Sequence, residues 1–371
     1  MSEIIKSTLL LITSVLFSIL ILEVGLRTAT PFPNGDARNI VSDSELGYVM
    51  NKSVTSIDKQ GFRNPADNRK ISVVAIGDSQ TYGYNADSEH AWPRALEKSL
   101  HVRVYNFGVG GYGLLQYKKL SERALALNPD SILIGLYLPN DMNDVCRSIL
   151  QFPNWQHWAL ENHYDVSVCP QTNKLAVDHE ITLSRWYRTE TAIGSLQTYF
   201  EDQQRARHQL HLGYGKEFFA AKNLPSETLF SVDRFEHLVD YMNPDAPDIQ
   251  KALLLFEEIT KDLKRDADAK KIHVGVIFTP SKESVYELHF KNAAIKPPQG
   301  YYQEIEHERA LQAKAQKILD DAGVKWVIVQ PDLTQLVMSQ ANIYPPGYDD
   351  HPLAAGYAAY ASAAERLVKS F

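Results

Sequence analysis

Cysteine is scarce in this sequence, and an excess of basic residues is missing. Two cysteines in 371 residues, Cys146 and Cys169, allow at most one intrachain disulfide. The formal net charge is −7 at pH 7, and no run of lysine and arginine is interleaved with aromatic residues. Nucleic-acid partners require such a basic surface, so we expect none. Spacings of the HExxH or CxxC kind are also missing, and the sequence predicts neither a metal nor a cofactor.

Long apolar runs are limited to one, near the N-terminus. Residues 7–22 carry no charge, Lys6 precedes them, and Glu23 and Arg27 follow. The run is slightly short for a membrane span but longer than a typical signal-peptide core. Small residues of a cleavage site are missing after it, so we expect an uncleaved membrane anchor over residues 1–27 rather than a removed signal peptide. The flanking charges hardly decide which side of the membrane the remainder occupies.

Whether the two cysteines form a disulfide depends on whether the remainder of the chain is exported. An oxidising compartment would let Cys146 and Cys169 pair, and the loop between them is short enough for a stabilising crosslink. Spacing does not give side-chain geometry, so two unrelated thiols remain the alternative.

Segments of strand length alternate with helical segments from residue 71 onward. The expected strands are residues 71–76, 102–107, 131–138, 273–279 and 324–329, and the expected helices are residues 91–100, 114–127, 249–263, 304–322 and 354–368. Apolar strands that alternate with helices form a parallel sheet covered on both faces. We therefore expect an α/β domain over residues 71–371, preceded by a connector or ordered extension over residues 28–70.

A long interruption separates the two halves of this pattern, between about residues 143 and 248. It carries both cysteines and many aromatic residues: Trp155, Trp158, Tyr164, Trp186, Tyr187, Tyr199, Phe218, Phe219 and Tyr241. A stretch of this length with its own apolar residues predicts an inserted, mostly helical cap. We expect most of these rings to form the core of the cap, and a minority to line a groove in which sugars stack on flat rings.

The first expected strand ends in IGDSQTYG, residues 76–83. Glycine, aspartate and serine are ordinary turn and N-cap residues. A sharp turn from strand to helix also presents the nucleophile in hydrolases. Ser79 lies at the carboxyl end of its strand, which is the edge where parallel sheets bind ligands.

Three later segments end at the same edge of the expected sheet. Residues 106–113, NFGVGGYG, contain four glycines, which let the backbone approach a ligand and aim an N–H into a cleft. Residues 138–141, LPND, place the Asn140 amide at a strand end. Residues 348–352, YDDHP, place His351 just before a helix. Each segment alone has a structural explanation, but their shared position marks a candidate site.

These four blocks resemble those of the SGNH (GDSL-like) hydrolases, a family named for Ser, Gly, Asn and His in four separated blocks. GDSQTYG is similar to the first block, NFGVGGYG to the second, PND to the third and DDHP to the fourth. The similarity runs from about residue 70 to the end, without the cap. The resemblance implies a three-layer α/β/α, flavodoxin-like fold with a five-stranded parallel sheet. The N-terminal apolar run is similar to that of the membrane-tethered bacterial branch.

The resemblance implies catalytic roles for the matched residues. Ser79 would be the nucleophile, His351 its general base, and Asp349 the acid that orients the imidazole, with Asp350 as the rival acid. The chemistry asks for the same types, because a neutral serine hydroxyl needs a base to take its proton. One departure concerns the acid, which many relatives place three residues before the histidine, where this chain has Tyr348.

Donors for the developing oxyanion follow from the same resemblance. They would be the Ser79 backbone N–H, the Gly111 N–H and the Asn140 side-chain amide, with Gly110 as a near alternative to Gly111. A second departure is Gln80, which stands where the namesake leucine follows the serine.

We therefore expect a serine esterase that removes a small acyl group, with acetyl the leading candidate, from a carbohydrate or lipid-linked substrate. The expected location is the inner membrane, with the catalytic domain on the periplasmic side. Alternatives are an O-acyltransferase that uses the same residues on an envelope polysaccharide, and a non-catalytic polysaccharide-binding or assembly component. The expected partner is a small acylated or glycan substrate, and no protein partner is predicted.

Overall fold

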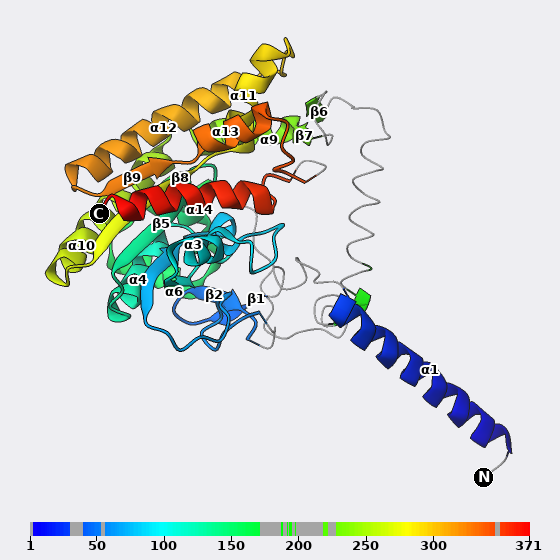
Figure 1. Cartoon of the computed structure of the whole chain (residues 1–371). Coiled ribbons are helices and arrows are strands. Elements are labelled where there is room, and N and C mark those ends of the chain that lie inside the picture. Colours follow the sequence, from blue (N-terminus) through cyan, green and yellow to red (C-terminus); the bar gives the residue numbers. More distant parts are fainter. Residues whose placement is uncertain are drawn as a thin grey trace.

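A five-stranded parallel sheet forms the centre of the molecule (Figure 1). The computed structural model describes residues 3–29, 40–52, 56–170, 218–221, 228–345 and 349–371, and a few single positions between 187 and 197. The strands are β3 (Ile71–Ile76), β4 (Arg103–Asn106), β5 (Ser131–Tyr137), β8 (His273–Thr279) and β9 (Lys325–Ile328). Their order is β4-β3-β5-β8-β9, and every neighbouring pair is parallel. This is the flavodoxin-like order, so the fold prediction is confirmed.

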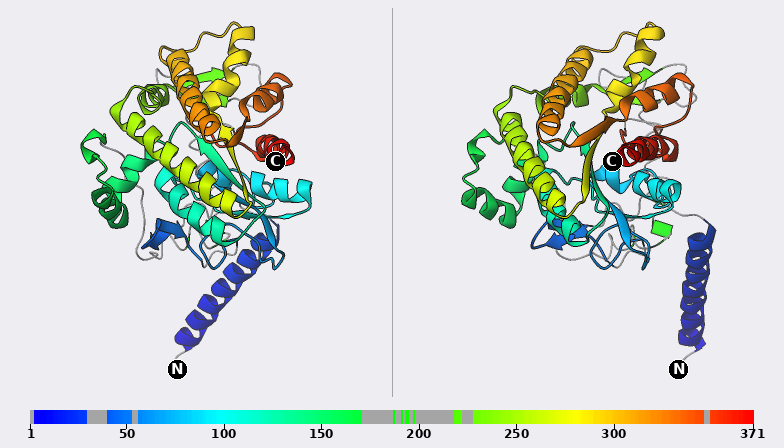
Figure 2. Two further views of the ribbon diagram at one scale, coloured as in Figure 1. Left: turned by 90° about the vertical axis from the view of Figure 1, so that its left-hand side faces the viewer. Right: turned by 60° about the vertical axis from the view of Figure 1, so that its left-hand side comes forward.

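Helices cover both faces of the sheet (Figure 2). One core contains residues of α4 (Leu114–Ala126), α10 (Pro247–Ala269) and the C-terminal half of α12 (Tyr301–Asp321). The other core contains residues of α3 (Trp92–Leu100), α11 (Lys282–Asn292), α13 (Gln330–Met338) and α14 (Ala354–Lys369). Successive residues of a strand point to opposite faces, so Val74 belongs to the first core and Val73 to the second.

The segment before the sheet is part of the first core from residue 40 onward. β1 (Ile40–Asp43) and β2 (Gly47–Met50) form an antiparallel hairpin, and all four residues of β2 are buried. Phe62, further along the same segment, is also fully buried. The described part of the expected connector is therefore an ordered extension that packs against the first core. The domain boundaries at residues 27, 70 and 71 remain predictions.

The described part of the long interruption joins the main core instead of forming one of its own. It comprises α5 (Asp144–Gln151), α6 (Pro153–Glu161), the short helix η1 (Val166–Val168), β6 (Phe218–Ala221), β7 (Thr228–Ser231) and α9 (Val232–Tyr241). Trp155 is buried in the first core, and Trp158 and Tyr164 pack against it. A disulfide joins Cys146 in α5 to Cys169, which follows η1. Trp186, Tyr199 and most of residues 171–227 lie outside the described residues.

Helix α1 (Glu3–Ala29) contains the apolar run. Its segment Ile5–Leu26 has a mean hydropathy of 2.5, and none of it is buried against the described protein. By length and composition this helix is able to cross a membrane, and the same description fits a signal sequence.

Candidate active site

A tight turn at the end of β3 presents Ser79. Helix α2 (Ser79–Tyr82) begins at this serine, and the Asp78 carboxylate caps it by accepting a 2.9 Å hydrogen bond from the Gln80 N–H. The helix ends at Gly83, whose φ of +89° is a conformation that favours glycine. A Cβ on Gly77 would lie 2.0 Å from Thr81 Oγ1, so only glycine lets the helix fold back this closely on the strand. Local turn chemistry therefore fixes where the serine points.

The structure brings His351 to this serine. His351 Nε2 lies 2.8 Å from Ser79 Oγ, although the two residues are 272 positions apart. The second ring nitrogen, Nδ1, lies 2.8 Å from Asp349 Oδ1. This geometry fits a neutral imidazole that donates through Nδ1 to the acid and accepts the serine proton at Nε2. The serine hydroxyl also has a longer contact of 3.2 Å with Asp78 Oδ2.

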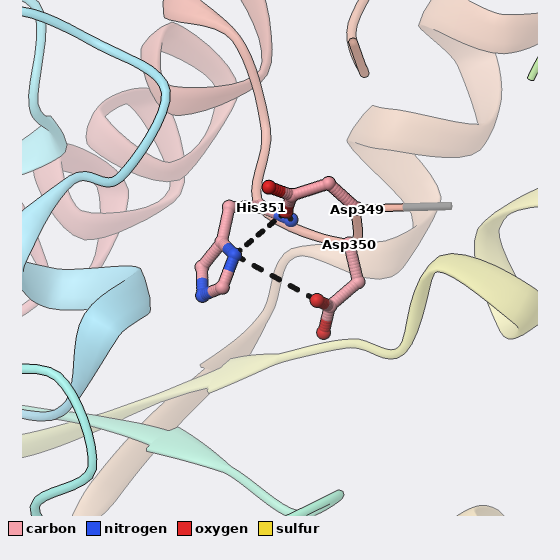
Figure 3. Close-up of side chains that lie close together, drawn as sticks. All are labelled: Asp349, Asp350 and His351. Carbon is pink, nitrogen blue, oxygen red and sulfur yellow. Dashed lines mark hydrogen bonds and ion pairs between the residues drawn. The ribbon is translucent and has the colours of Figure 1, made fainter. Parts of the chain in front are cut away.

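Both candidate acids lie beside the imidazole, but only Asp349 is at hydrogen-bond distance (Figure 3). Asp350 Oδ1 is 3.7 Å from Nδ1, and the other oxygen of Asp350 accepts a hydrogen bond from the Tyr137 hydroxyl. Asp349 Oδ1 additionally accepts the His351 backbone N–H at 2.9 Å. The two-residue spacing therefore forms a turn in which one carboxylate holds both the backbone and the ring of the histidine. Tyr348 lies outside the described residues.

The charges around His351 favour its protonated form. Burial of the ring alone would lower its pKa, but the carboxylates of Asp350, Asp349 and Asp78 outweigh burial and raise the pKa above 6.5. Burial would raise the pKa of Asp349, and the hydrogen bond from His351 lowers it below its ordinary value. Burial raises the pKa of Asp78 to about 6. An imidazolium that forms during reaction is therefore stabilised where it arises.

Candidate oxyanion donors lie at the same edge. Among the residues that the structure describes, the backbone N–H groups of Ser79, Gly110 and Gly111 donate no hydrogen bond. Asn140 follows β5, its side chain hydrogen-bonds to the Asp78 carboxylate, and its Oδ1 is buried with no partner in the described part of the chain. Both glycines thus keep a backbone N–H without an acceptor among the described residues.

Two further groups hold the His351 segment in place. Lys282, which is 1% exposed at the start of α11, donates a 3.1 Å hydrogen bond from Nζ to the Asp349 carbonyl. The Asn85 side-chain amide donates to the His351 carbonyl at 3.0 Å. Neither residue has a motif signal in the sequence.

A second set of residues missed by sequence analysis supports α2. The buried Arg63 guanidinium donates to the carbonyls of Gly83 and Ala86, each at 3.1 Å, just beyond the helix. The Asn106 amide donates to the Thr81 carbonyl at 3.1 Å. An arginine in a polar segment carries no periodicity signal, so only its burial, visible in the structure, reveals this role.

Asp349, Asp350 and His351 also form a group whose possible metal-ligand atoms lie within 4.8 Å of one another. Nitrogen Nδ1 is engaged with Asp349 and Nε2 with Ser79. Coordination through either nitrogen would break one of these hydrogen bonds.

Comparison with known proteins finds likeness only among solved structures. No protein-family model matches the chain, and no curated protein matches it. The chain is similar to a protein described as lipolytic and of the G-D-S-L family from Desulfitobacterium hafniense, with 14% identity, a TM-score of 0.36, and coverage of 80% of this chain and 98% of that one.

Two further solved structures show a likeness of the same order. LAE5, an alpha/beta hydrolase enzyme from the metagenome of Lake Arreo, has 10% identity and a TM-score of 0.40, with 82% and 97% of the chains covered. Axe2, an acetylxylan esterase from Geobacillus stearothermophilus, has 13% identity and a TM-score of 0.39, with 81% and 95% covered. All three TM-scores lie below 0.5, so these likenesses carry no argument about the activity of this chain.

Proposed function

We propose that this protein is a serine esterase of the SGNH type, with Ser79 as nucleophile, His351 as general base and Asp349 as the orienting acid. The observation that carries the proposal is the continuous pair of 2.8 Å contacts from Ser79 through the imidazole to Asp349. These side chains come from opposite ends of the sequence and meet at the carboxyl edge of a parallel sheet, where such sheets bind ligands. That placement supports a role in catalysis rather than in packing.

The proposed reaction proceeds through an acyl-enzyme. Ser79 Oγ attacks the ester carbonyl carbon while its proton moves to His351 Nε2. The carbonyl oxygen becomes an oxyanion and accepts hydrogen bonds from backbone N–H groups and the Asn140 amide. The imidazolium then gives its proton to the departing alcohol oxygen, which leaves the acyl group on Ser79. A water molecule then attacks the acyl carbonyl carbon while its proton moves to His351 Nε2. The imidazolium gives this proton to Ser79 Oγ as the acyl–serine bond breaks. The carboxylic acid leaves, and the serine and the neutral histidine are restored.

The acyl group in this proposal is small, with acetyl the leading candidate. The Tyr84 ring lies beside the imidazole, with 4.9 Å between their centroids. A Cβ placed on Gly110 would lie 2.2 Å from the Tyr84 hydroxyl oxygen. Tyr84 thus lies close to both the imidazole and the glycine loop, which supports a short acyl chain over a long one. A carbohydrate or lipid-linked acceptor, and a site facing the periplasm from a membrane anchor formed by α1, complete the proposal.

The test uses the full-length protein in detergent with p-nitrophenyl acetate as substrate. We expect hydrolysis by the wild type and a loss of about three orders of magnitude or more in turnover for Ser79→Ala. A fluorophosphonate probe should label Ser79. A matched control is Ser131→Ala, because Ser131 is a buried serine at the opposite end of the sheet and its hydroxyl has no partner among the described residues. Equal rates for wild type and Ser79→Ala would favour the non-catalytic binding role.

The same assay separates hydrolysis from acyl transfer. Addition of a sugar alcohol should leave the yield of free acetate unchanged if water is the acceptor. A fall in acetate that matches the appearance of acetylated sugar would instead assign the protein as an O-acyltransferase, since both reactions use the same acyl-enzyme.

A further inference from the structure

The glycine loop after β4 is anchored by two side chains from other parts of the chain, one fully buried and one half-buried. The Tyr48 hydroxyl, on β2, donates a 2.9 Å hydrogen bond to the Gly110 carbonyl. The Arg147 guanidinium, on α5, donates a 2.8 Å hydrogen bond to the Gly111 carbonyl. Neither residue belongs to the four sequence blocks, and neither contacts the reacting groups.

Tyr48 is held rigidly on the core side of the loop. Its side chain is fully buried, and its ring packs against the rings of Tyr112 and Phe152 with centroid distances of 5.2 and 5.3 Å. The Tyr112 hydroxyl donates in turn to the Tyr48 carbonyl at 2.6 Å. Burial raises the pKa of Tyr48 well above 10, so its hydroxyl keeps its proton throughout the pH range of an esterase assay.

The bond from Tyr48 determines the direction of one particular N–H. The carbonyl of Gly110 and the N–H of Gly111 belong to the same planar trans peptide, in which the two groups point in opposite directions. Since Tyr48 holds the carbonyl from the core side, the Gly111 N–H points away from the core. The other side of the loop borders the catalytic site, because Gly110 lies next to Tyr84 and the Tyr84 ring contacts His351.

Without such an anchor this peptide would be free to rotate. Gly111 has a φ of +79°, a conformation in which glycine meets little steric resistance to alternatives. Arg147 fixes the following peptide through the Gly111 carbonyl and is itself paired with Asp144 at 2.5 Å. A hydrogen bond to the carbonyl also polarises the peptide and strengthens its N–H as a donor.

We propose that Tyr48 is a positioning residue of the oxyanion hole, which aims the Gly111 N–H at the oxyanion by holding the Gly110 carbonyl, while Arg147 fixes the next peptide. This inference rests on the proposed esterase function and deepens it. It selects Gly111 over Gly110 as the donor, and it gives the segment before the sheet a task in catalysis.

The test compares Tyr48→Phe with Tyr105→Phe in the full-length protein. Tyr48→Phe removes only the hydroxyl, and we expect kcat for p-nitrophenyl acetate to fall about 10- to 100-fold with KM changed less than about twofold, since loss of a whole oxyanion donor costs about 10²–10³. Tyr105→Phe is the matched control, because it removes a hydroxyl that donates to the Asp58 carboxylate from a buried tyrosine of the same core but leaves the Gly110 carbonyl bonded.

A second readout separates positioning from general loss of structure. The thionoester analogue of the substrate carries sulfur in place of the carbonyl oxygen and accepts hydrogen bonds poorly. Misaligned N–H donors should therefore reduce the preference for the oxygen ester, by about tenfold in Tyr48→Phe. Rates of Ser79 labelling by a fluorophosphonate should follow the same order among the variants.

The outcomes are distinguishable. Wild-type rates and wild-type ester preference in Tyr48→Phe would overturn the role of Tyr48, as would equal losses in Tyr48→Phe and Tyr105→Phe, which would assign the effect to packing. Failure of the probe to label Ser79 in the wild type would contradict the proposed function itself.

Discussion

At the scale of single residues, the carboxylates around His351 control the pKa of its imidazole. Three carboxylates raise this pKa. In the proposed mechanism the neutral imidazole, and not the imidazolium, accepts the serine proton. Activity should therefore rise with pH as the imidazolium loses its proton, with a midpoint above 6.5. Asp350→Asn removes one of the charges that stabilise the imidazolium, so the pKa falls and the midpoint should move to lower pH. The measurement is kcat/KM against pH.

Asp349→Asn provides the contrast in the same assay. Asp349 accepts the Nδ1 hydrogen bond, and an amide there would favour the wrong tautomer, so we expect the plateau of activity to fall about 10²–10⁴-fold. Asp350→Asn should keep its plateau within about tenfold, because Tyr137 and not Nδ1 is its hydrogen-bond partner. A larger plateau loss in Asp350→Asn than in Asp349→Asn would reverse the assignment of the two acids.

The sequence predicted candidate site residues at the ends of strands, and their roles stay predictions; it missed the residues that hold these segments in place. Ser79 and Asn140 follow apolar strands directly, and strand ends in a parallel sheet share one edge, so their approach follows from the fold class. Tyr48 and Arg63 act through backbone carbonyls of distant segments. Such contacts produce no periodic pattern or motif in the sequence. Tertiary packing brings these side chains to the carbonyls, and residue spacing does not predict that packing.

At the scale of elements, the short helix α2 depends on groups outside it. Four residues form too short a helix to be stable alone. The Arg63 guanidinium donates to the carbonyls of Gly83 and Ala86 just beyond its end. Arg63→Met keeps the volume but leaves buried carbonyls without this donor, and we expect the free energy of unfolding to fall by about 1–3 kcal/mol. Chemical denaturation of the detergent-solubilised protein measures this change.

A surface arginine serves as the control for this prediction. Arg265 lies on α10 with 67% of its side chain exposed and pairs only with exposed acids among the described residues. Arg265→Met should leave the denaturation midpoint unchanged. An Arg63→Met variant as stable as Arg265→Met would show that the guanidinium is not needed to support α2.

The elements themselves were predicted unevenly. The five strands of the sheet were expected within one residue at each end, because each alternates along the chain with a helical segment. The hairpin β1–β2 was missed because its strands lie in a polar segment, before the first strand–helix alternation begins. The described part of the predicted cap packs on the main core through Trp155, and a sequence gives no indication of which core a buried ring joins.

At the scale of the whole molecule, the Cys146–Cys169 disulfide closes a loop between residues 23 positions apart. A crosslink that closes a loop of this length stabilises the folded state by about 3 kcal/mol, because it lowers the conformational entropy of the unfolded chain. We expect reductant to lower the unfolding midpoint of the wild type and to leave that of Cys146→Ala/Cys169→Ala unchanged. Thiol titration of the denatured protein should count no thiols before reduction and two after. An unchanged count would exclude the crosslink.

We expect helix α1 to determine where the whole molecule is located. Its exposed apolar segment Ile5–Leu26 predicts a retained anchor. An epitope fused to the N-terminus should therefore remain on the mature protein and stay in the membrane pellet after carbonate extraction. The double substitution Leu16→Asp/Leu20→Asp should release the protein from the membrane. Each aspartate raises the free energy of membrane insertion by about 3 kcal/mol. Loss of the epitope from the mature wild type would identify a cleaved signal instead.

The separation of 272 positions between serine and imidazole has a consequence for biosynthesis. The ribosome makes the Ser79 segment first and the His351 segment much later, just before α14, which packs beside α3. Under the proposed mechanism, a nascent or prematurely terminated polypeptide that lacks His351 carries a serine hydroxyl without its base. The proposed activity then begins only after the segment around His351 has been synthesised and has folded against the sheet.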